Sequence, residues 1–296
     1  MSSLRGVKRR YRRVVARGTL WVRQLKQRNY KAGELMSCES KRRAPNVARI
    51  YDYLLGGKDN YEEDRLAAQQ LLQAVPDAAI AAWDNRQFLG RAVKFLAEEA
   101  GIGQFIDIGT GLPTRGNVHA IAHRHAPQSR VVYVDNDPAV IAHGNVLLNN
   151  HPNAIAIRAD MRDPKSIIMH SELRELIKFD EPVAVLLVAV LHFIRDAENP
   201  FLIVDELKSA MARGSYLVIS HVTDDQVSGE ATRLVEGIYE NANAPGTARS
   251  RRDIAKFFEG LEMIPPGLVS AAQWRNEWML AEPGRTIFYA GAGKKR

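Results

Sequence analysis

The hydrophobic positions along the chain change their spacing near residue 105. Before that point, apolar residues recur every three or four positions, which is the spacing of amphipathic helices. The helices predicted from this spacing cover residues 49–55, 62–73 and 77–100. The third helix would begin after the N-cap residue Asp77 and end at Gly101. Its apolar stripe is interrupted by Asn85, a polar side chain that needs a hydrogen-bond partner if it is buried.

Beyond residue 105, short apolar runs rich in β-branched residues alternate with helix-like stretches. The predicted strands cover 105–108, 130–134, 154–158, 183–190 and 215–220. The predicted helices cover 115–125, 138–149, 164–177 and 200–212. Two later runs, 263–269 and 286–289, are also predicted as strands, and the stretch between them contains Trp274 and Trp278. Apolar strands that alternate with helices indicate a doubly wound, mostly parallel α/β sheet covered on both faces.

The composition is that of a globular protein, with 46% hydrophobic and 25% charged residues among 296. A single cysteine, Cys38, excludes a disulfide framework, and no cluster of histidines or acids has the spacing of metal ligands. The longest apolar run covers 183–191, far short of the roughly 20 residues of a membrane helix. We therefore expect a soluble, cytoplasmic protein without an integral membrane segment and without a metal.

The positive charge is concentrated at the N-terminus. Residues 1–35 carry eleven basic side chains and one acidic one, which leaves 30 basic and 33 acidic side chains in the rest of the chain. A basic segment with apolar residues around Trp21 can bind nucleic acid or lie on an anionic membrane as an amphipathic helix. We expect instead that residues 1–43 form a disordered extension and that the functional chain begins near Met36. The mildly acidic body speaks against nucleic acid as its partner.

A glycine-rich turn follows the first predicted strand. Gly109 and Gly111 permit a tight turn and a close approach of the backbone to a ligand. The second strand ends at Asp135, where a carboxylate can accept hydrogen bonds from both hydroxyls of a ribose, and Asn136 adds a further polar side chain. Ligands of doubly wound sheets bind at this edge, so the sequence predicts a nucleoside site.

Several features favour S-adenosylmethionine over a dinucleotide at this site. Position 114 is threonine where a dinucleotide site has glycine or alanine, and Pro113 lacks an amide donor. The Asp107 carboxylate would repel a pyrophosphate, whereas it would attract a ligand that carries an ammonium and a sulfonium. Asp160 follows the third strand, where it can bind an adenine amino group, and Met161 can pack on the ring. The alternative for Asp160 is an acid at the start of a helix.

Five stretches of the sequence together resemble one family. They are residues 51–60, 84–89, 107–114, 132–137 and 220–221, of which the first, YDYLLGGKDN, is very specific and the third is shared by all class I methyltransferases. Over about residues 44–292 the chain is similar to the actinobacterial S-adenosyl-L-methionine-dependent methyltransferase family formerly catalogued as a domain of unknown function. The resemblance implies a seven-stranded Rossmann-like sheet with a reversed final strand, a helical lid at 44–104 and a cofactor-binding core at 105–296.

The resemblance also implies roles for individual residues. The methionine part of the cofactor would be lined by Asp107, Gly109 and Gly111, the ribose by Asp135, and the adenine by Asp160 and Met161. Arg86 is our candidate for binding the cofactor carboxylate, because a guanidinium binds a carboxylate through two hydrogen bonds, although it could equally be a surface residue. The lid over the cofactor would contain Tyr51, Tyr53, Lys58 and Asn60, or this segment could merely cover the sheet edge.

Methyl transfer from a sulfonium needs a general base only when the acceptor is a hydroxyl or a protonated amine. His192 and His221 follow the fourth and fifth predicted strands, and either could take the proton, or each could bond to the backbone where the strand ends. We expect a methyltransferase that uses S-adenosyl-L-methionine and a small-molecule acceptor. The alternatives are an NAD-dependent oxidoreductase and a regulatory protein that binds S-adenosylmethionine without turnover.

Overall fold

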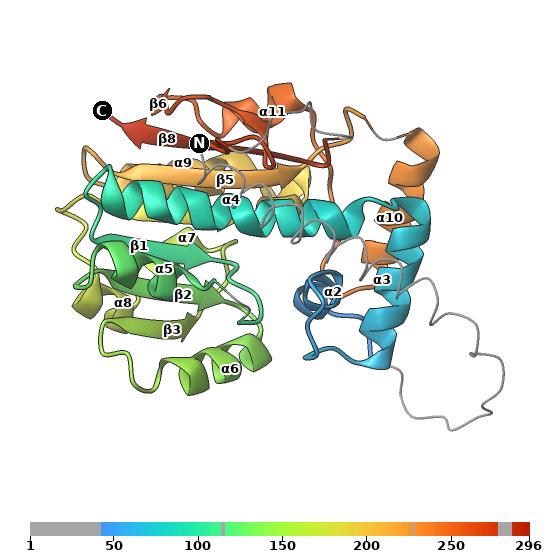
Figure 1. Ribbon diagram of the computed structural model, residues 1–296, viewed down its shortest axis with the longest axis horizontal. Helices are drawn as coiled ribbons and strands as arrows, with labels where there is room; N and C mark the ends of the chain where they lie inside the picture. The colour runs from blue at the N-terminus through green and yellow to red at the C-terminus, as the bar shows by residue number, and fades with distance from the viewer. Residues whose placement is uncertain (1–42, 114–115, 227, 278–285) are drawn as a thin grey trace, which may run out of the picture. The chain divides into compact units, whose positions relative to one another are not determined.

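The computed structural model of the chain describes residues 43–113, 116–226, 228–277 and 286–296. The chain divides into two units, residues 1–43 and residues 44–296, and the second contains the elements labelled in Figure 1. The predicted basic extension, the predicted start near Met36, and the positions of Thr114, Arg115 and Trp278 lie outside the described residues.

An eight-stranded sheet forms the centre of the second unit. Its strands are β1 (Gln104–Ile108), β2 (Arg130–Asp135), β3 (Ala154–Arg158), β4 (Ala184–Val188), β5 (Tyr216–Val222), β6 (Leu261–Met263), β7 (Val269–Ser270) and β8 (Phe288–Lys295). The strand order is β3-β2-β1-β4-β5-β8-β6, and β7 pairs with β8. Strands β1 to β5 are parallel, whereas β8 is antiparallel to β5, with Phe288 opposite Val222. Because the strand order reverses between β1 and β4, the carboxyl ends of these strands form the expected binding edge.

Helices cover both faces of the sheet, as the continuously apolar strands predicted. The helices are α2 (Val47–Leu54), α3 (Glu62–Ala74), α4 (Ala78–Glu98), α5 (Val118–His125), α6 (Pro138–Leu148), α7 (Pro164–Ile168), α8 (Ser171–Leu176), α9 (Pro200–Ala210), α10 (Gly229–Glu240) and α11 (Arg251–Lys256), with short 3-10 helices η1 (Leu191–Phe193) and η2 (Asp196–Glu198). Ile167 of α7, Val204 of α9 and Phe257, which follows α11, pack on one face of the sheet. On the other face Phe95 of α4 lies edge-on to Tyr216 of β5. Figure 1 shows α4 and α5 in front of the sheet and α7 and α9 behind it.

Three helices, α2, α3 and α10, lie beyond the carboxyl ends of the strands and are called the helical cap below. Helix α3 packs against both α2 and α10, and α4 extends from the helical cap to the sheet, as Figure 1 shows. The side chain of Asn46 accepts hydrogen bonds from the backbone N–H groups of Ala48 and Arg49 and so caps the start of α2. A cavity can therefore form between the helical cap and the sheet edge.

Most predicted elements are confirmed to within a few residues, but the helix predicted at 164–177 is wrong as a single element. It consists of α7 and α8, because the chain leaves the helical conformation at His170, which precedes the first residue of α8. Helix α10 was not predicted. Among the described residues, no helix is long and apolar enough to cross a membrane.

The two late strands were also predicted with incorrect bounds. The run 263–269 contains Pro265 and Pro266, which have no N–H to donate, and only its ends pair with the sheet, as β6 and β7. The run 286–289 is the start of a longer strand, β8, whose Ala-Gly-Ala-Gly sequence lacks the side chains by which strands are recognised. The predicted reversal of the final strand is confirmed, although the sheet has eight strands and not seven.

Candidate functional site

A cavity of about 250 Å³ lies between the carboxyl ends of the strands and the helical cap. Its walls come from α2, α3, α4 and α10, from the ends of β1 to β5, and from Phe288 at the start of β8. Nine of the eleven site residues predicted from the sequence line it, namely Arg86, Asp107, Gly109, Gly111, Asp135, Asn136, Asp160, Met161 and His192. Tyr53 and His221 do not belong to the lining.

The three predicted acids meet in this cavity. Asp107 lies in β1, Asp135 ends β2, and Asp160 follows β3, so the acids come from three neighbouring strands. The two oxygens of the Asp135 carboxylate accept hydrogen bonds from the backbone N–H groups of Gly111, at 3.0 Å, and Asp137, at 3.0 Å. These two bonds fix the orientation of the carboxylate before any ligand arrives.

Asp107 is a buried carboxylate with an unusual affinity for protons. Burial raises its pKa to about 6, although the Arg86 guanidinium and a hydrogen bond with the Thr110 side chain act in the opposite direction. The negative charge of Asp135 raises the pKa further. An ionised Asp107 is therefore costly in the ligand-free protein, and a cationic ligand would relieve that cost.

The glycine turn brings the backbone close to the tip of β4. Gly109 has a φ of +71°, and a Cβ atom at this position would lie 2.1 Å from Cγ2 of Val190. Gly111 has a φ of +65° and donates its N–H to Asp135. Both glycines are thus required by backbone conformation, and Gly109 is required by space as well.

Asp160 is held in place at the third strand end. Its carboxylate accepts hydrogen bonds from the Arg162 backbone N–H at 2.9 Å and from Asn136 Nδ2 at 3.2 Å. Burial alone would raise the pKa of Asp160, but these hydrogen bonds and the positive charge of Arg162 lower it below its usual value. The neighbouring Met161 is buried and lines the cavity. The alternative given for Asp160, an acid at the start of a helix, describes Asp163 instead. The Asp163 side chain accepts a hydrogen bond from the Ser166 N–H at the start of α7.

Arg86 lies on the part of α4 that borders the cavity. Its Nη2 donates to the Gly116 carbonyl oxygen at 3.2 Å and to Asn117 Oδ1 at 3.1 Å, and its charge acts on Asp107. Arg86 is therefore a cavity residue and not a surface residue turned toward bulk solvent.

Asn85, the polar residue that interrupts the apolar stripe of α4, is hydrogen-bonded to Tyr51 in the cavity wall. Asn85 Nδ2 donates to Tyr51 Oη at 2.9 Å, and Tyr51 donates to the Ala82 carbonyl oxygen at 3.0 Å. Asn85 is 1% exposed, and its Oδ1 has no hydrogen-bond partner within the described residues. A donor on a bound ligand would satisfy this oxygen.

The predicted lid residues divide between two roles. Tyr51 lines the cavity, whereas the Tyr53 hydroxyl lies 3.4 Å from Gln69 Nε2, away from the lining, because residues two apart on a helix face different sides. Asn60 donates to Asp52 Oδ2 at 2.8 Å, and Lys58 is exposed. The segment after α2 is thus folded back on Asp52.

Asp52 needs this tight turn. A Cβ atom on Gly57 would lie 1.8 Å from Asp52 Oδ1, so no other residue fits at position 57 without displacing the carboxylate. The same carboxylate accepts a hydrogen bond from the Asp59 backbone N–H at 2.9 Å. Within residues 51–60, the packing of one buried acid therefore accounts for Gly57 and Asn60.

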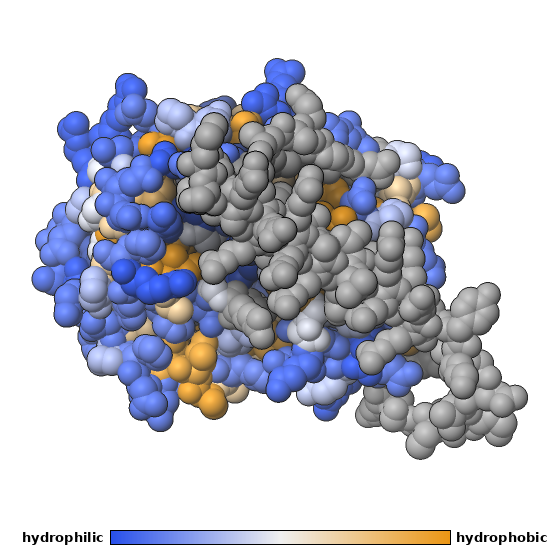
Figure 2. Space-filling view, viewed as in Figure 1, coloured by the Kyte–Doolittle hydropathy of each residue, from blue (hydrophilic) through white to orange (hydrophobic). Residues whose placement is uncertain are grey.

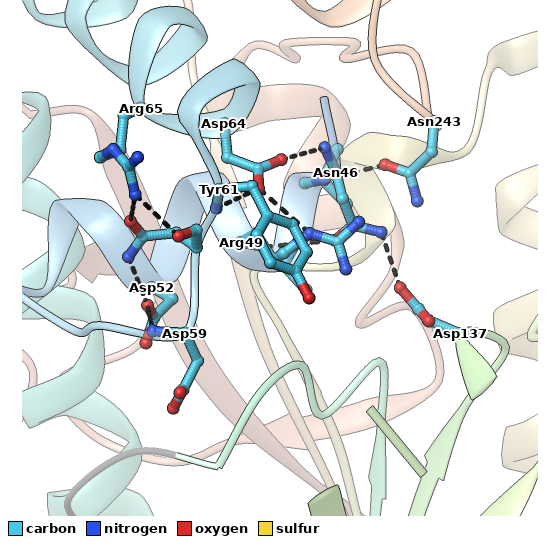
Figure 3. A network of polar contacts seen from close by, with 12 residues as sticks. Asn46, Arg49, Asp52, Asp59, Tyr61, Asp64, Arg65, Asp137 and Asn243 are labelled. Carbon is cyan, nitrogen blue, oxygen red and sulfur yellow. Dashed lines mark hydrogen bonds and ion pairs between the residues drawn. The ribbon is translucent and has the colours of Figure 1, made fainter. Parts of the chain in front are cut away.

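A polar network ties the helical cap to the acidic strand ends (Figure 3). Asn46 Nδ2 donates to Asp137 Oδ2 at 2.6 Å, and the Asn46 backbone N–H donates to Asp64 Oδ1 at 2.8 Å. The Asn243 side chain, beyond α10, accepts a hydrogen bond from Val47 N–H at 2.8 Å. The start of α2 is therefore connected to α3, to the tip of β2 and to the segment after α10.

His192 lies in η1, directly after β4, and lines the cavity. It is buried, and its Nδ1 has no hydrogen-bond partner within the described residues. Burial, assisted by the positive charge of Arg249, lowers the pKa of His192 well below its usual value. The imidazole is therefore neutral near pH 7.

His221 lies inside β5 and not after it, and it is fully buried. Its Nδ1 donates to the Val222 carbonyl oxygen at 2.7 Å, and Arg249 Nη1 lies 2.8 Å from its Nε2, which must accept because a guanidinium only donates. Burial lowers the pKa of His221 to about 3, and the nearby Arg249 charge acts in the same direction. Both ring nitrogens are occupied, so this arrangement corresponds to the structural alternative for His221 and leaves no nitrogen for a substrate.

Several residues that complete the cavity on the side of β4, β5 and β8 were not predicted. They are Val222, Thr223, Val235, Tyr239 and Phe288. The amphipathic spacing of Thr232, Val235 and Tyr239 along α10 is the signal that could have placed this helix against the cavity.

Comparison with known proteins gives one consistent result. The family model for S-adenosyl methyltransferases matches residues 36–296. A DUF574 family protein from Streptomyces avermitilis is 38% identical, with a TM-score of 0.81 over 86% of this chain and 98% of its own. A protein from Thermobifida fusca named as a candidate methyltransferase is 39% identical, with a TM-score of 0.79 over 85% of this chain and 95% of its own. The search among curated proteins gives no match.

These matches confirm the resemblance seen in the sequence, since the family model covers most of the chain and the two structures exceed a third in identity. The fold, the cofactor and the reaction class follow from them together with the cavity at the binding edge of the sheet. The chain belongs to the S-adenosyl methyltransferase family and is an S-adenosyl-L-methionine-dependent methyltransferase.

Proposed function

We propose that the cavity binds S-adenosyl-L-methionine on the side of β1, β2 and β3 and a small-molecule acceptor on the side of β4, β5 and β8. The observation that carries this proposal is the convergence of Asp107, Asp135 and Asp160 on one cavity. Three carboxylates from neighbouring strands can interact with an ammonium, a ribose and an adenine amino group in that order.

The residues present fit this cofactor. Asn85, whose buried Oδ1 has no partner within the described residues, belongs to the cavity lining. Gly109 leaves no room for a Cβ atom beside Val190, so the turn requires glycine at this position. In the proposed arrangement Asp107 attracts the ammonium, Gly109 and Gly111 line the methionine part, and Arg86 binds the carboxylate. A guanidinium can do so while keeping its bonds to Gly116 and Asn117, because it has five N–H donors.

Asp135 is proposed to accept hydrogen bonds from the ribose hydroxyls. Each carboxylate oxygen already accepts one backbone N–H and has a further lone pair available. Asn136 and Asp160, which are bonded to each other, would border the adenine, and the buried Met161 would pack on its ring. The bonds between these residues reduce the ordering needed when the cofactor binds.

The chain then has to align an acceptor with the donor and exclude water. When it is bound, S-adenosylmethionine supplies a methyl group that is already activated by the sulfonium. The apolar walls of the helical cap keep water from the reacting atoms, and alignment of the two reactants lowers the entropic part of the barrier. His192 is proposed to take a proton from the acceptor, because it is neutral and lines the cavity.

The acceptor is proposed to be a small molecule because the cavity is concave and enclosed by the helical cap. An NAD-dependent oxidoreductase is no longer an alternative, since the family assignment specifies the cofactor. A regulatory protein that binds S-adenosylmethionine without turnover is likewise no longer an alternative, since the chain belongs to a family of methyltransferases.

Calorimetric titration with S-adenosylmethionine and S-adenosylhomocysteine tests the cofactor site. We expect Asp135→Ala to weaken binding of both by about 1–3 kcal/mol, the loss associated with hydrogen bonds to a charged group. The matched control is Asp205→Ala, an exposed acid on α9. Unchanged affinity in folded Asp135→Ala protein would refute the ribose assignment.

A further inference from the structure

The two sides of the cavity differ in polarity. The lining at the ends of β1, β2 and β3 contains the acids Asp107, Asp135, Asp137 and Asp160. The lining from β4, β5, β8 and α10 consists mainly of apolar and aromatic side chains, among them Val190, Phe193, Val222, Val235, Tyr239, Ile287 and Phe288. Since the strand order puts β3-β2-β1 on one side of the reversal and β4-β5-β8 on the other, the cavity runs from a polar donor side to an apolar side.

The apolar side is built around aromatic rings. The centroids of His192 and Phe193 lie 4.3 Å apart, those of Phe193 and Tyr239 5.7 Å, and those of His192 and Phe288 6.0 Å. These rings come from η1, α10 and β8, which are far apart in the sequence and meet only here. Rings arranged around a space favour a planar ligand, which can make offset-stacked or edge-to-face contacts with them.

Fixed charges are scarce on this side. Among the described lining residues from β4, β5, β8, α10 and the segment 243–248, Glu236 is the charged one, and it is exposed. The nearby guanidinium of Arg249 is not part of the lining, because it bonds to Asp196, to His221 and to the carbonyl oxygens of Leu191 and Ile194. The Arg162 guanidinium also lines the cavity, and its Nη2 donates to the Phe193 carbonyl oxygen at 3.4 Å, but this charge is paired with Asp160 and Glu198. Among the described lining residues, a carboxylate or phosphate on the acceptor would therefore find only a cation that is already paired, so this side disfavours an anionic ligand.

One polar group on this side lacks a partner. His192 Nδ1 is buried and has no hydrogen bond within the described residues, although the residue lines the cavity. The backbone around it is fixed, since the Thr247 N–H donates to the His192 carbonyl oxygen at 2.7 Å. A neutral imidazole in an apolar wall can exchange a hydrogen bond with a hydroxyl, which needs no counter-ion.

We propose that the acceptor is a neutral, planar aromatic molecule with a hydroxyl group, which packs against the wall formed by Phe193, Tyr239 and Phe288 with its hydroxyl toward His192. This inference rests on the proposed function, because the proposed function places the methyl donor on the other side of the same cavity. In the reaction the hydroxyl oxygen forms the bond to the methyl carbon, the electron pair of the broken carbon–sulfur bond stays on sulfur, and the hydroxyl proton passes to His192 and then to solvent.

Binding of 2-naphthol to protein saturated with S-adenosylhomocysteine tests the inference, with 2-naphthoate as the anionic probe of nearly equal shape. We expect 2-naphthol to bind at least tenfold more tightly than 2-naphthoate, and to accept a radiolabelled methyl group from S-adenosylmethionine. Tyr239→Leu should weaken 2-naphthol binding at least fivefold, whereas Tyr239→Phe, which keeps the ring, should stay within twofold.

Tyr239 is a suitable position for this test because α10 contains no buried residue. Replacement of Tyr239 therefore leaves the hydrophobic core intact. The control Phe179→Leu removes an aromatic ring outside the cavity lining. Equal binding of 2-naphthol and 2-naphthoate, or full binding by Tyr239→Leu, would overturn the acceptor class while leaving the donor site in place. Failure of S-adenosylhomocysteine to bind the unaltered protein would instead overturn the donor site and, with it, this inference.

Discussion

Asp107 illustrates how a binding residue can reduce the stability of the fold that carries it. Its pKa of about 6 in the folded protein exceeds the ordinary value of 3.8, so the folded state binds the proton more tightly than the unfolded chain. Folding is therefore favoured by protonation, and the stability is lost as the pH rises from about 4 through 6. At neutral pH the ionised carboxylate destabilises the ligand-free protein.

We expect Asp107→Asn to raise the free energy of unfolding at pH 7.5 by about 1–3 kcal/mol, since a neutral amide avoids the cost of the buried charge. The same substitution should weaken S-adenosylmethionine binding at least tenfold, because the ammonium loses its carboxylate. Thermal unfolding and calorimetry measure the two effects, with the exposed Asp205→Asn as a control. A variant that is less stable and binds normally would contradict the assigned role.

Gly109 allows conformational strain and steric exclusion to be measured separately. Gly109 and Gly101 both have positive φ values, of +71° and +68°, but a Cβ atom at Gly101 meets nothing within 4 Å. We expect Gly101→Ala to cost about 1 kcal/mol of stability from the backbone conformation alone. Gly109→Ala should cost more, by about 1–3 kcal/mol, because its Cβ atom also overlaps Val190. Equal losses in urea unfolding would show that the contact with Val190 relaxes at no cost.

Residue types at strand ends were predictable, and the directions of their side chains were not. The acids and glycines were recognised because a parallel sheet brings the ends of its strands to one edge. His221 was placed after β5, yet β5 extends to Val222, and the histidine is enclosed within the sheet. One residue of strand length decides whether a side chain enters a cavity or the core, and hydrophobic patterns do not resolve strand ends to one residue.

At the scale of elements, the helical cap depends on a single asparagine. Asn46 caps α2 with its side-chain oxygen and donates with its side-chain nitrogen to Asp137, the residue whose N–H holds Asp135. The start of the helical cap is thus coupled to the carboxylate proposed to bind the ribose (Figure 3).

We expect Asn46→Ser to keep the cap of α2, because serine is also a good N-cap residue, and to lose the bond to Asp137. Stability should change by less than about 1 kcal/mol, whereas calorimetric affinity for S-adenosylhomocysteine should fall three- to tenfold. The comparison variant Ser228→Ala removes the N-cap of α10, which has no bond to the acidic strand ends. Affinity equal to that of the unaltered protein would show that the two parts are not coupled.

Strands with continuous apolar runs were predicted well, whereas α10 was missed and β8 was predicted too short. The strands β1, β2 and β4 are almost wholly buried, so their apolar runs are easy to recognise. Helix α10 contains no buried residue, and β8 is rich in glycine and alanine, so neither has the composition of a core element. Helix α10 belongs to the apolar side of the site, which is why the sequence described the donor side more completely.

At the scale of the whole molecule, the cavity is built from the second unit. Its lining residues lie between Asn46 and Phe288, and the family model begins at residue 36. On the face that Figure 2 shows, the described residues are mostly hydrophilic and appear in blue. The basic segment therefore contributes charge to the protein without contributing to the described walls of the site.

We expect a chain that lacks residues 1–35 to bind S-adenosylmethionine within twofold of the full chain, since the described lining begins at Asn46. Side-by-side calorimetry of the two proteins at 0.15 M salt measures this. Repetition at low salt serves as a control, because a purely electrostatic contribution of the basic segment would grow as screening weakens. A loss of tenfold or more in the shorter chain would show that the segment belongs to the binding site.

Because the cavity is divided between two sets of strand ends, substitutions can change the acceptor specificity of this enzyme separately from its cofactor binding. The turns after β1, β2 and β3 and the contacts from α10, η1 and the start of β8 are encoded by separate stretches of sequence. A combinatorial library confined to positions 193, 235, 239 and 288 would alter one wall and leave the opposite wall untouched. Natural substitutions can likewise change the residues of one wall alone. New acceptor specificities can therefore evolve while the residues proposed to bind the methyl donor stay unchanged.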